Sequence, residues 1–419
     1  MHGTDLTAFI RAHRQEASRS SAPLTGIRVI DLGSVVAAPF GATLLGDYGA
    51  EVIKVEPPSV PDAIRNWGVI AEQYQPFWLL AARNKLPITL NLKHPSAQRI
   101  LAELVQQSDV LLENMRPGTL DRLGFPAAKL WELNKGLIIG RISGYGQTGP
   151  YATKPGFGTL AEAMSGFTHM NAHPGGPPTN PPIALADMIA GTHLALGIVM
   201  ALRHQRRGES GGQELDLSLY EPLFGFMAAD FLVQALSGVA PQPAGNEAHY
   251  TSPRNSYQTG DGKWVVLSAS SQAPFERLMD LVGHPELKTA PGFRTNQERT
   301  QTASRAVLNG IIGDWIKARP LTDVLDACEN AGVTIGPVFD MSDIAADPHV
   351  HARGTLAPTL DPVSGKTIPL PEAAIRLSAT PGKVRFPGLP MGAANHVVLE
   401  DVLGYSAEQI AAAERDGAI

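Results

Sequence analysis

The first stretch that suggests chemistry is a glycine pattern at residues 144–149. Gly144, Gly146 and Gly149 follow the apolar run "GLIIGRIS" with the G-x-G-x-x-G spacing of a dinucleotide-binding turn. Such a turn needs its third glycine at the start of a helix, so that pyrophosphate meets free N–H groups. Pro150 and Pro155 follow instead, and no acidic residue stands at the usual distance after a second strand. We therefore expect a flexible turn whose glycines let a ligand approach the backbone.

The second stretch is "PPIALADMIAGTHLALG", in which Asp187 is surrounded by apolar residues. A carboxylate in such surroundings is costly to bury unless it is paired or functional. It follows a proline-rich segment and precedes a helical pattern. This placement fits an N-cap, and it also fits a nucleophile that a helix start keeps ionised. The residues alone leave both readings open.

The elements that position these residues begin with an alternation of strands and helices. An apolar run at 29–32, the alternating segment "AEVIKVEPP" and strand patterns at 86–92, 110–114 and 137–143 alternate with helical patterns over residues 25–145. This order predicts a parallel, doubly wound sheet. Residues 150–182 are rich in Gly and Pro and predict a loop that lines a site. A long apolar helix is expected over residues 183–208, with a basic C-terminal end.

Bulk composition excludes several function classes. The chain has 419 residues, 43% of them hydrophobic, and a net charge of -6, so nucleic acid is not an expected partner. Cys328 is the only cysteine, which excludes internal disulfides and cysteine-rich metal sites and fits the cytoplasm. The first 22 residues lack the apolar region of a signal peptide. The run "ALGIVMAL" is too short to span a bilayer, so no membrane association is expected.

Several stretches together resemble the class III CoA-transferases, of which alpha-methylacyl-CoA racemase is a relative. They include "LTGIRVIDLGSVVAAPFGATLLGDYGAEVIKVEPP", "DVLLENMRPGTLDRLGF", "ISGYGQTGPYATKPGFG", "GGPPTNPPIALADMIAG" and "RRGESGGQELDLSLYE". Their order and spacing agree with the family from Leu24 to Ile419.

The resemblance implies an α/β fold in which a Rossmann-like large domain with a parallel sheet is joined to a smaller α+β domain. It implies that two chains interlock like rings, as a homodimer or a heteromer. Residues 1–205 would form the N-terminal part of the large domain and 206–250 a linker. Residues 251–345 would form the small domain, and 346–419 a linker that returns to the large domain.

The resemblance also places the catalytic aspartate at Asp187. In the family this carboxylate attacks a donor thioester, becomes an acyl anhydride and then an enzyme–CoA thioester, and CoA passes to an acceptor acid. No metal and no tightly bound cofactor is implied, because coenzyme A and acyl-CoA are substrates.

CoA contacts carry over from the family by position. They fall in four groups, after the first strand, after two further strand ends and in the glycine-rich loop: Val36 and Ala37; Leu90, Asn91, Leu92 and Lys93; Asn114, Met115, Arg116 and Arg122; and Pro155, Gly156, Phe157 and Gly158. The cations Lys93, Arg116 and Arg122 suit phosphates, although for each residue taken alone a solvated surface cation is the default interpretation.

Departures from the family pattern bear on the reaction. Phe157 stands where the racemase has its histidine, and phenylalanine cannot carry a proton, which favours transfer over racemisation. His169 and His173 follow at the wrong spacing. Val36, Phe157 and residues 268–272 suggest a pocket too apolar for oxalate, so we expect a dicarboxylic or branched acid as acceptor, with succinyl-CoA or acetyl-CoA as donor.

A third hypothesis is that the chain is a non-catalytic partner subunit of a heteromer, which the presence of Asp187 disfavours.

Overall fold

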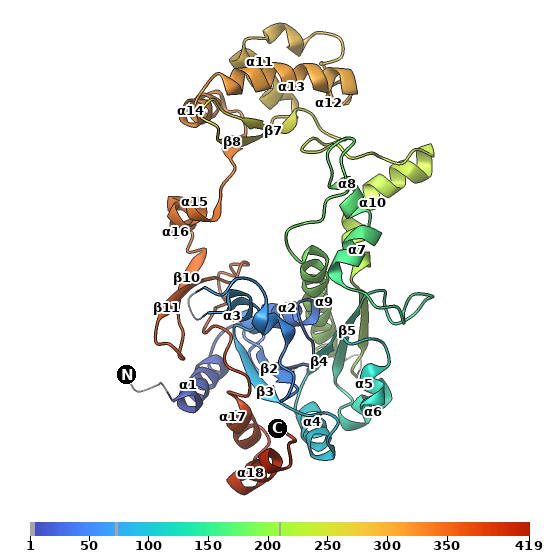
Figure 1. Cartoon of the computed structure of the whole chain (residues 1–419), viewed down its shortest axis with the longest axis vertical. Coiled ribbons are helices and arrows are strands. Elements are labelled where there is room, and N and C mark those ends of the chain that lie inside the picture. The colour runs from blue at the N-terminus through green and yellow to red at the C-terminus, as the bar shows by residue number, and fades with distance from the viewer. Residues whose placement is uncertain (1–4, 72–73, 209–210) are drawn as a thin grey trace. The chain divides into compact units, whose positions relative to one another are not determined.

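The computed structural model describes residues 5–71, 74–208 and 211–419 (Figure 1). Glu209 and Ser210, within the family-like stretch that begins at Arg206, lie outside these ranges. The chain divides into two compact units. Unit 1 comprises residues 1–167, 180–229 and 351–419, and unit 2 comprises 168–179 and 230–350.

Unit 1 is built on a parallel sheet, as the alternating pattern predicts. Its six described strands run in the order β3-β2-β1-β4-β5-β6, and every neighbouring pair is parallel. Their bounds are β1 Arg28–Asp31, β2 Glu51–Glu56, β3 Lys85–Thr89, β4 Val110–Glu113, β5 Ile138–Ser143 and β6 Glu214–Ser218. This is the order of doubly wound nucleotide-binding sheets, in which the order of the strands across the sheet reverses between β1 and β4. The predicted α/β class is confirmed.

Helices connect these strands and cover the sheet. They are α1 Leu6–Ser18, α2 Ala37–Asp47, α3 Pro76–Ala81, α4 Pro95–Gln106, α5 Thr119–Arg122, α6 Ala127–Leu133, α7 Gly158–Met164, α9 Leu185–Gln205 and α10 Tyr220–Ser237, which continues into unit 2. One of these results differs from the sequence-based expectations, because α7 falls in the expected loop 150–182. Strand β6 and helix α10 agree with the strand and apolar helix that "GQELDLSLYEPLFGFMAADFLVQAL" predicts, within the stretch 206–250 that the resemblance implies as a linker.

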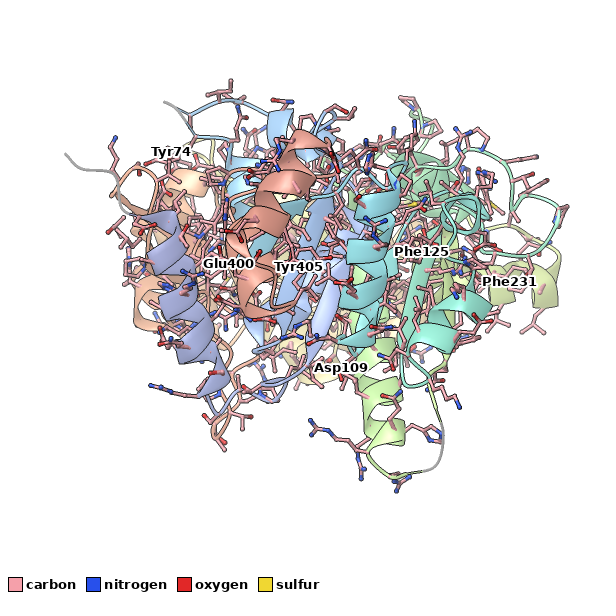
Figure 2. The ribbon with its side chains drawn as sticks, turned by 90° about the horizontal axis from the view of Figure 1, so that it is seen from below. Tyr74, Asp109, Phe125, Phe231, Glu400 and Tyr405 are labelled. Atoms are coloured by element: carbon pink, nitrogen blue, oxygen red, sulfur yellow. The ribbon has the colours of Figure 1, made fainter. Side chains whose placement is uncertain are left out.

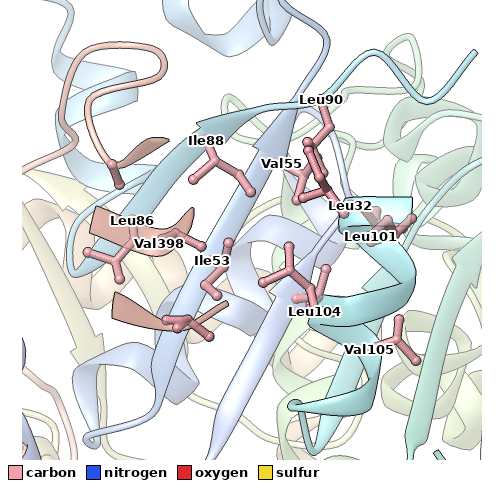
Figure 3. Packing of buried hydrophobic residues seen from close by; sticks show 14 of the residues in the cluster. Leu32, Ile53, Val55, Leu86, Ile88, Leu90, Leu101, Leu104, Val105 and Val398 are labelled. Carbon is pink, nitrogen blue, oxygen red and sulfur yellow. The ribbon is translucent and has the colours of Figure 1, made fainter. Parts of the chain in front are cut away.

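One face of the sheet packs against α4. Leu101, Leu104 and Val105 of this helix are fully buried and belong to the same cluster as Ile53 of β2 and Leu86 of β3 (Figure 3). Apolar residues on one side of α4 at helical spacing bury against strands that are apolar on both sides, as parallel sheets require.

The C-terminal segment completes this layer. It contains the hairpin of β10 Leu356–Leu360 and β11 Thr367–Pro371, followed by α17 Asn395–Asp401 and α18 Ala407–Arg415. The N–H of Asn91 donates to the carbonyl of Ala418 at 2.8 Å, so the chain end is bound at the end of β3. Figure 2 shows the segment that bears Glu400 and Tyr405 beside α1, where Arg11 pairs with Glu400.

The other face of the sheet carries α2 and α9, which pack with their backbones close together. A side chain at Gly191 of α9 would lie 2.5 Å from the carbonyl oxygen of Ala37, and one at Gly41 of α2 would lie 2.8 Å from that of Gly191. Only glycine permits this approach. The crossing brings the beginning of α9 next to the beginning of α2.

Helix α9 is long and apolar enough, by length and composition, to cross a membrane. Its Ala190, Leu194 and Ile198 are fully buried in the cluster that α2 and the sheet also form. The helix therefore serves as a core element of unit 1, which accounts for its composition.

Unit 2 is an α+β unit, also as expected. Its antiparallel sheet has the order β7-β8-β9, with bounds Arg254–Gln258, Trp264–Ser268 and Ile335–Pro337. The helices are α8 Phe167–Met170 at the boundary, α11 Gln272–Val282, α12 Asn296–Arg299, α13 Thr302–Lys317, α14 Leu321–Ala331, α15 Met341–Ala346 and α16 Pro348–Ala352, which reaches into unit 1.

Candidate functional site

A cavity of about 760 Å³ lies within unit 1 where the strand order reverses. Residues 34–37 after β1 and 114–117 after β4 line it. The two loops are joined directly, because the N–H of Ser34 donates to Oδ1 of Asn114 and Nδ2 of Asn114 donates to the carbonyl of Ser34, both at 2.8 Å. Open parallel sheets bind ligands in this crevice, beyond the carboxyl ends of the strands.

A buried ionic network holds the loop after β1. Val35 has a left-handed backbone with φ of 63°, which is costly for a β-branched residue. The carboxylate of Asp62 accepts the N–H of Val35 at 3.0 Å and pairs with Nζ of Lys54 at 3.0 Å. Burial disfavours the Lys54 charge, yet the nearby Asp31 and Asp62 carboxylates keep the pKa of its ammonium above the ordinary value. This network fixes the strained turn that leads into α2.

Asp187 lies in the first turn of α9 and lines the cavity. The N-cap residue of α9 is Ala184, whose side chain makes no capping hydrogen bond. The interpretation of Asp187 as the N-cap residue is therefore wrong. Glu162 of α7 takes over part of that role, because its Oε1 accepts the N–H of Ala186 at 3.2 Å. The Asp187 carboxylate is therefore available to the cavity.

Glycines bring the loop before α7 against this carboxylate. A side chain at Gly158 would lie 1.9 Å from Oδ2 of Asp187, so the carboxylate can keep this position only while residue 158 is glycine. A side chain at Gly156 would lie 2.7 Å from the Cα of Gly144, which shows that the two backbones touch. Gly146 and Gly149 have left-handed φ values of 85° and 90°, and α7 begins only at Gly158. The glycine pattern thus forms a turn and a backbone contact, as expected, and no helix start of the dinucleotide type follows it.

Burial first, and then the negative charge of Glu162, raise the pKa of Asp187 to about 6, against the lowering effect of a backbone hydrogen bond. At neutral pH the carboxylate is mainly ionised, but it is less stabilised than a solvated aspartate. Such a group is more basic and more nucleophilic than an ordinary carboxylate, and perturbed acids in a cavity mark candidate catalytic sites.

The cavity brings together most of the residues to which the family resemblance assigned CoA contacts. These are Val36, Ala37, Asn114, Met115, Arg116, Pro155, Gly156, Phe157 and Gly158, which line it together with Asp187. Val36 and Ala37 stand at the beginning of α2, whose first N–H groups have no partner within the helix. These N–H groups suit an anionic oxygen.

The remaining predicted contacts lie elsewhere. The four residues after β3 lie at the edge strand, which is separated from the reversal point by β2 and β1; they are Leu90, Asn91, Leu92 and Lys93. Leu90 is buried in the core, and Lys93 is exposed. Arg122 is exposed at the end of α5, where Nη2 donates to the hydroxyl of Thr119 at 2.8 Å. Their contact with an extended ligand stays a prediction.

Sequence reasoning missed several lining residues. Trp67 and Phe77 line the cavity with their rings in an edge contact at 6.3 Å. Lys154, Ser143 and Glu162 also line it. The aromatic residues at 67–78 were the available signal, because exposed large aromatics in a loop region indicate binding. Glu162 gave no such signal, since a glutamate in a short helix reads as surface.

Comparison with known proteins shows the family to which the chain belongs. CoA-transferase family III matches residues 24–395, so this chain belongs to that family and is an enzyme that transfers CoA. It is 38% identical over 400 residues to the succinyl-CoA--L-malate CoA-transferase beta subunit of Chloroflexus aurantiacus, covering 94% of this chain and 98% of that one. It is 38% identical over 398 residues to succinyl-CoA--D-citramalate CoA-transferase of the same organism, with coverage of 94% and 98%. The crystal structure of a CAIB/BAIF family protein from Brucella suis superposes with a TM-score of 0.79 at 28% identity, covering 91% of this chain and 99% of that one.

Proposed function

We propose that this enzyme transfers CoA from succinyl-CoA to a dicarboxylic acid, with Asp187 as the covalent nucleophile. The observation that supports this most is the placement of one partly buried carboxylate in the cavity at the sheet reversal, against Gly158. The substrate class draws on the two relatives named for succinyl-CoA and for malate or citramalate. Apolar lining by Val36 and Phe157 agrees with an acid larger than oxalate.

The proposed reaction proceeds through three intermediates. An Asp187 oxygen attacks the thioester carbonyl, the C–S bond breaks, and an acyl-aspartyl anhydride and CoA thiolate form. The thiolate attacks the aspartyl carbonyl and releases the donor as its carboxylate, leaving an aspartyl-CoA thioester. The acceptor carboxylate attacks that thioester and expels the thiolate, which then attacks the acceptor carbonyl of the second anhydride and frees Asp187. Dividing the exchange in this way lowers each barrier.

The surroundings of Asp187 support this role. Its pKa of about 6 leaves it ionised at neutral pH, which nucleophilic attack requires. Each attack creates a tetrahedral oxyanion that needs hydrogen-bond donors. The free N–H groups at the beginning of α2 lie at the cavity edge and are suitable donors.

Racemisation is the alternative chemistry. It requires a base that removes the α proton, and the cavity has Phe157, 68% exposed, at the position of the racemase histidine. His169 and His173 are not among the described residues that line the cavity. Transfer therefore accounts better for the residues present.

We also propose that the enzyme acts as a homodimer in the cytoplasm. The second half of α10 exposes Leu232, Val233 and Leu236, and exposed apolar surface of this kind marks protein interfaces. A heteromer is the alternative, because relatives are named as alpha and beta subunits of one transferase.

A screen of acyl-CoA donors against carboxylic acids, read by mass spectrometry, tests the proposal. We expect the purified chain to form malyl-, citramalyl- or a similar acyl-CoA from succinyl-CoA. Deuterium incorporation at the α carbon without an acceptor acid, together with no CoA transfer, would instead establish a racemase.

The variant Asp187→Ala tests the nucleophile. We expect turnover to fall by at least about 10⁴-fold, because no covalent intermediate can form, while the fold is retained. Circular dichroism and gel filtration check the fold. Activity within tenfold of wild type would remove Asp187 from the mechanism.

A further inference from the structure

A second buried ion pair lies near the one that holds Val35. Lys85, the first residue of β3, is 1% exposed, and its Nζ donates to Oδ2 of Asp31 at 2.9 Å. Asp31, the last residue of β1, is fully buried. Taking two charges out of water is costly, and apolar side chains of similar volume in place of a buried pair often stabilise a fold. Stability alone therefore does not explain this pair.

The pair is bonded to the beginning of α2. The same Nζ of Lys85 donates to the carbonyl of Pro39 at 2.6 Å, and Oδ1 of Asp31 accepts the N–H of Gly33 at 3.0 Å. Pro39 lies in the first turn of α2, and Gly33 lies in the loop before it. A side chain at Gly33 would lie 2.8 Å from Cδ of Pro39 and 3.0 Å from Oδ1 of Asp31. The end of β1, the loop and the first turn of α2 are therefore in close contact.

The position of this first turn matters for the site. The N-cap residue Val36 makes no side-chain hydrogen bond that would fix the helix start. The carbonyl of Ala37 lies against Gly191 of α9, one helical turn beyond Asp187. A displacement of the first turn of α2 would therefore change the distance between its free N–H groups and the Asp187 carboxylate.

We propose that Lys85 and Asp31 are positioning residues for CoA transfer, which hold the first turn of α2 so that its N–H groups face the oxyanion formed at Asp187. The proposal rests on the proposed function. Neither residue of the pair is among the described residues that line the cavity, so both act through the backbone of α2. Donors that are fixed before the reaction stabilise developing charge without reorganising, and charged hydrogen bonds are strong enough to fix a backbone carbonyl.

The double variant Lys85→Met/Asp31→Asn tests this role. Methionine fills a similar volume, asparagine keeps an acceptor for the N–H of Gly33, and neither charge of the pair is left alone. With succinyl-CoA and the best acceptor acid of the screen, we expect kcat to fall by about 10-fold to 100-fold, because displaced donors stabilise the oxyanion less. The Kd for free CoA, measured by calorimetry, should stay within about threefold, since the oxyanion exists only during the reaction.

Arg28→Met/Glu51→Gln is the matched control. Nε of Arg28 donates to Glu51 at 2.6 Å and joins the first residues of β1 and β2, at the end of the sheet opposite the cavity. Neither residue is among the described residues that line the cavity. We expect kcat within about twofold of wild type, because a distant surface pair contributes little.

Asp31→Asn alone is the second variant and serves if the double variant does not fold. It preserves the side-chain volume and the acceptor for Gly33 but removes the charge that holds Lys85. We expect kcat to fall by at least about fivefold, again with little change in the Kd for free CoA.

Four outcomes would overturn the positioning role in an active wild-type enzyme. They are a kcat within twofold of wild type for a folded variant, a fall in kcat no larger than that of the control, a loss of affinity for free CoA as large as the fall in kcat, and failure of both variants to fold, which would make the pair a requirement of the fold alone. A wild-type chain that transfers no CoA to any acid would instead overturn the proposed function.

Discussion

At the scale of single residues, the two carboxylates of the site, Glu162 and Asp187, have different roles. Glu162 is 2% exposed and binds the N–H of Ala186 at the start of α9. Asp187, one residue further on, does not have to bind that N–H and lines the cavity, where burial and the Glu162 charge make its carboxylate more basic. In the proposed mechanism, Glu162 positions the helix and raises the pKa of Asp187, and Asp187 is the group that reacts.

The effect of the Glu162 charge on the pKa of Asp187 predicts the pH dependence of the reaction. Only ionised Asp187 attacks, so kcat/KM should rise with pH through about 6, the raised pKa of this carboxyl. Glu162→Gln keeps an oxygen for the N–H of Ala186 but removes the negative charge that raises this pKa. The acidic limb of the variant should therefore move to lower pH. Initial rates at subsaturating succinyl-CoA, from pH 4.5 to 8, measure the pH profile of kcat/KM for wild type and for Glu162→Gln. Both profiles should be flat above pH 7. A limb that stays in place or moves to higher pH would contradict the electrostatic account.

A second prediction concerns the glycine that touches the nucleophile. Gly158→Ala would place a methyl group 1.9 Å from Oδ2 of Asp187, so the carboxylate must move. Displacement of about 1 Å at a reacting group costs about 100-fold in rate. We expect kcat to fall by about this factor or more.

The control for this change is Gly310→Ala. Gly310 lies within α13, and a side chain there meets nothing within 4 Å. Replacing a glycine inside a helix by alanine should raise stability by about 0.5–1 kcal/mol and leave kcat unchanged. Equal kcat for Gly158→Ala and wild type would show that the carboxylate does not react from this position.

At the scale of elements, the crossing of α2 and α9 sets the distance between the nucleophile and the loop after β1. Gly191→Ala would place a methyl group 2.5 Å from the carbonyl oxygen of Ala37, a backbone atom that cannot rotate away. We expect a loss of about 1–3 kcal/mol in the free energy of unfolding, measured by urea denaturation. kcat should fall as well, because both walls of the cavity shift. Stability and kcat both equal to wild type would show that the helices do not need this close contact.

Much of this fold was predictable from the sequence, because each strand from β1 to β5 is a buried apolar run between helical patterns. A strand at "GQELDLS" was predictable as well, but its place as the edge strand beside β5 was not, because strand pairing is set by tertiary contacts. Helix α7 was missed because Gly158 and Gly166 bracket a short stretch without clear periodicity. The sequence singled out Asp187 as either an N-cap or a nucleophile, and the family resemblance favoured the nucleophile. Its freedom from capping depends on Glu162, a tertiary contact across 25 residues of chain that no local pattern reveals.

At the scale of the whole molecule, the exposed apolar surface of α10 predicts association. Leu236 is 86% exposed, and Leu232 precedes it by one helical turn. The double variant Leu232→Asp/Leu236→Asp should change a dimer of the wild-type chain into a monomer, because charges at an interface core cannot be desolvated without partners. Light scattering after gel filtration measures the mass of each. A wild-type chain that is monomeric when expressed alone would favour a heteromer, and a variant that stays dimeric would exclude this surface.

The most direct test of the central claim is the chemical trapping of Asp187. The enzyme is mixed with succinyl-CoA, treated with hydroxylamine, digested and analysed by mass spectrometry. If an activated acyl group forms on this carboxylate, the peptide that spans residue 187 gains the mass of a hydroxamate, and the same peptide of Asp187→Ala does not. An enzyme that transfers CoA while this peptide remains unmodified would contradict covalent catalysis at Asp187.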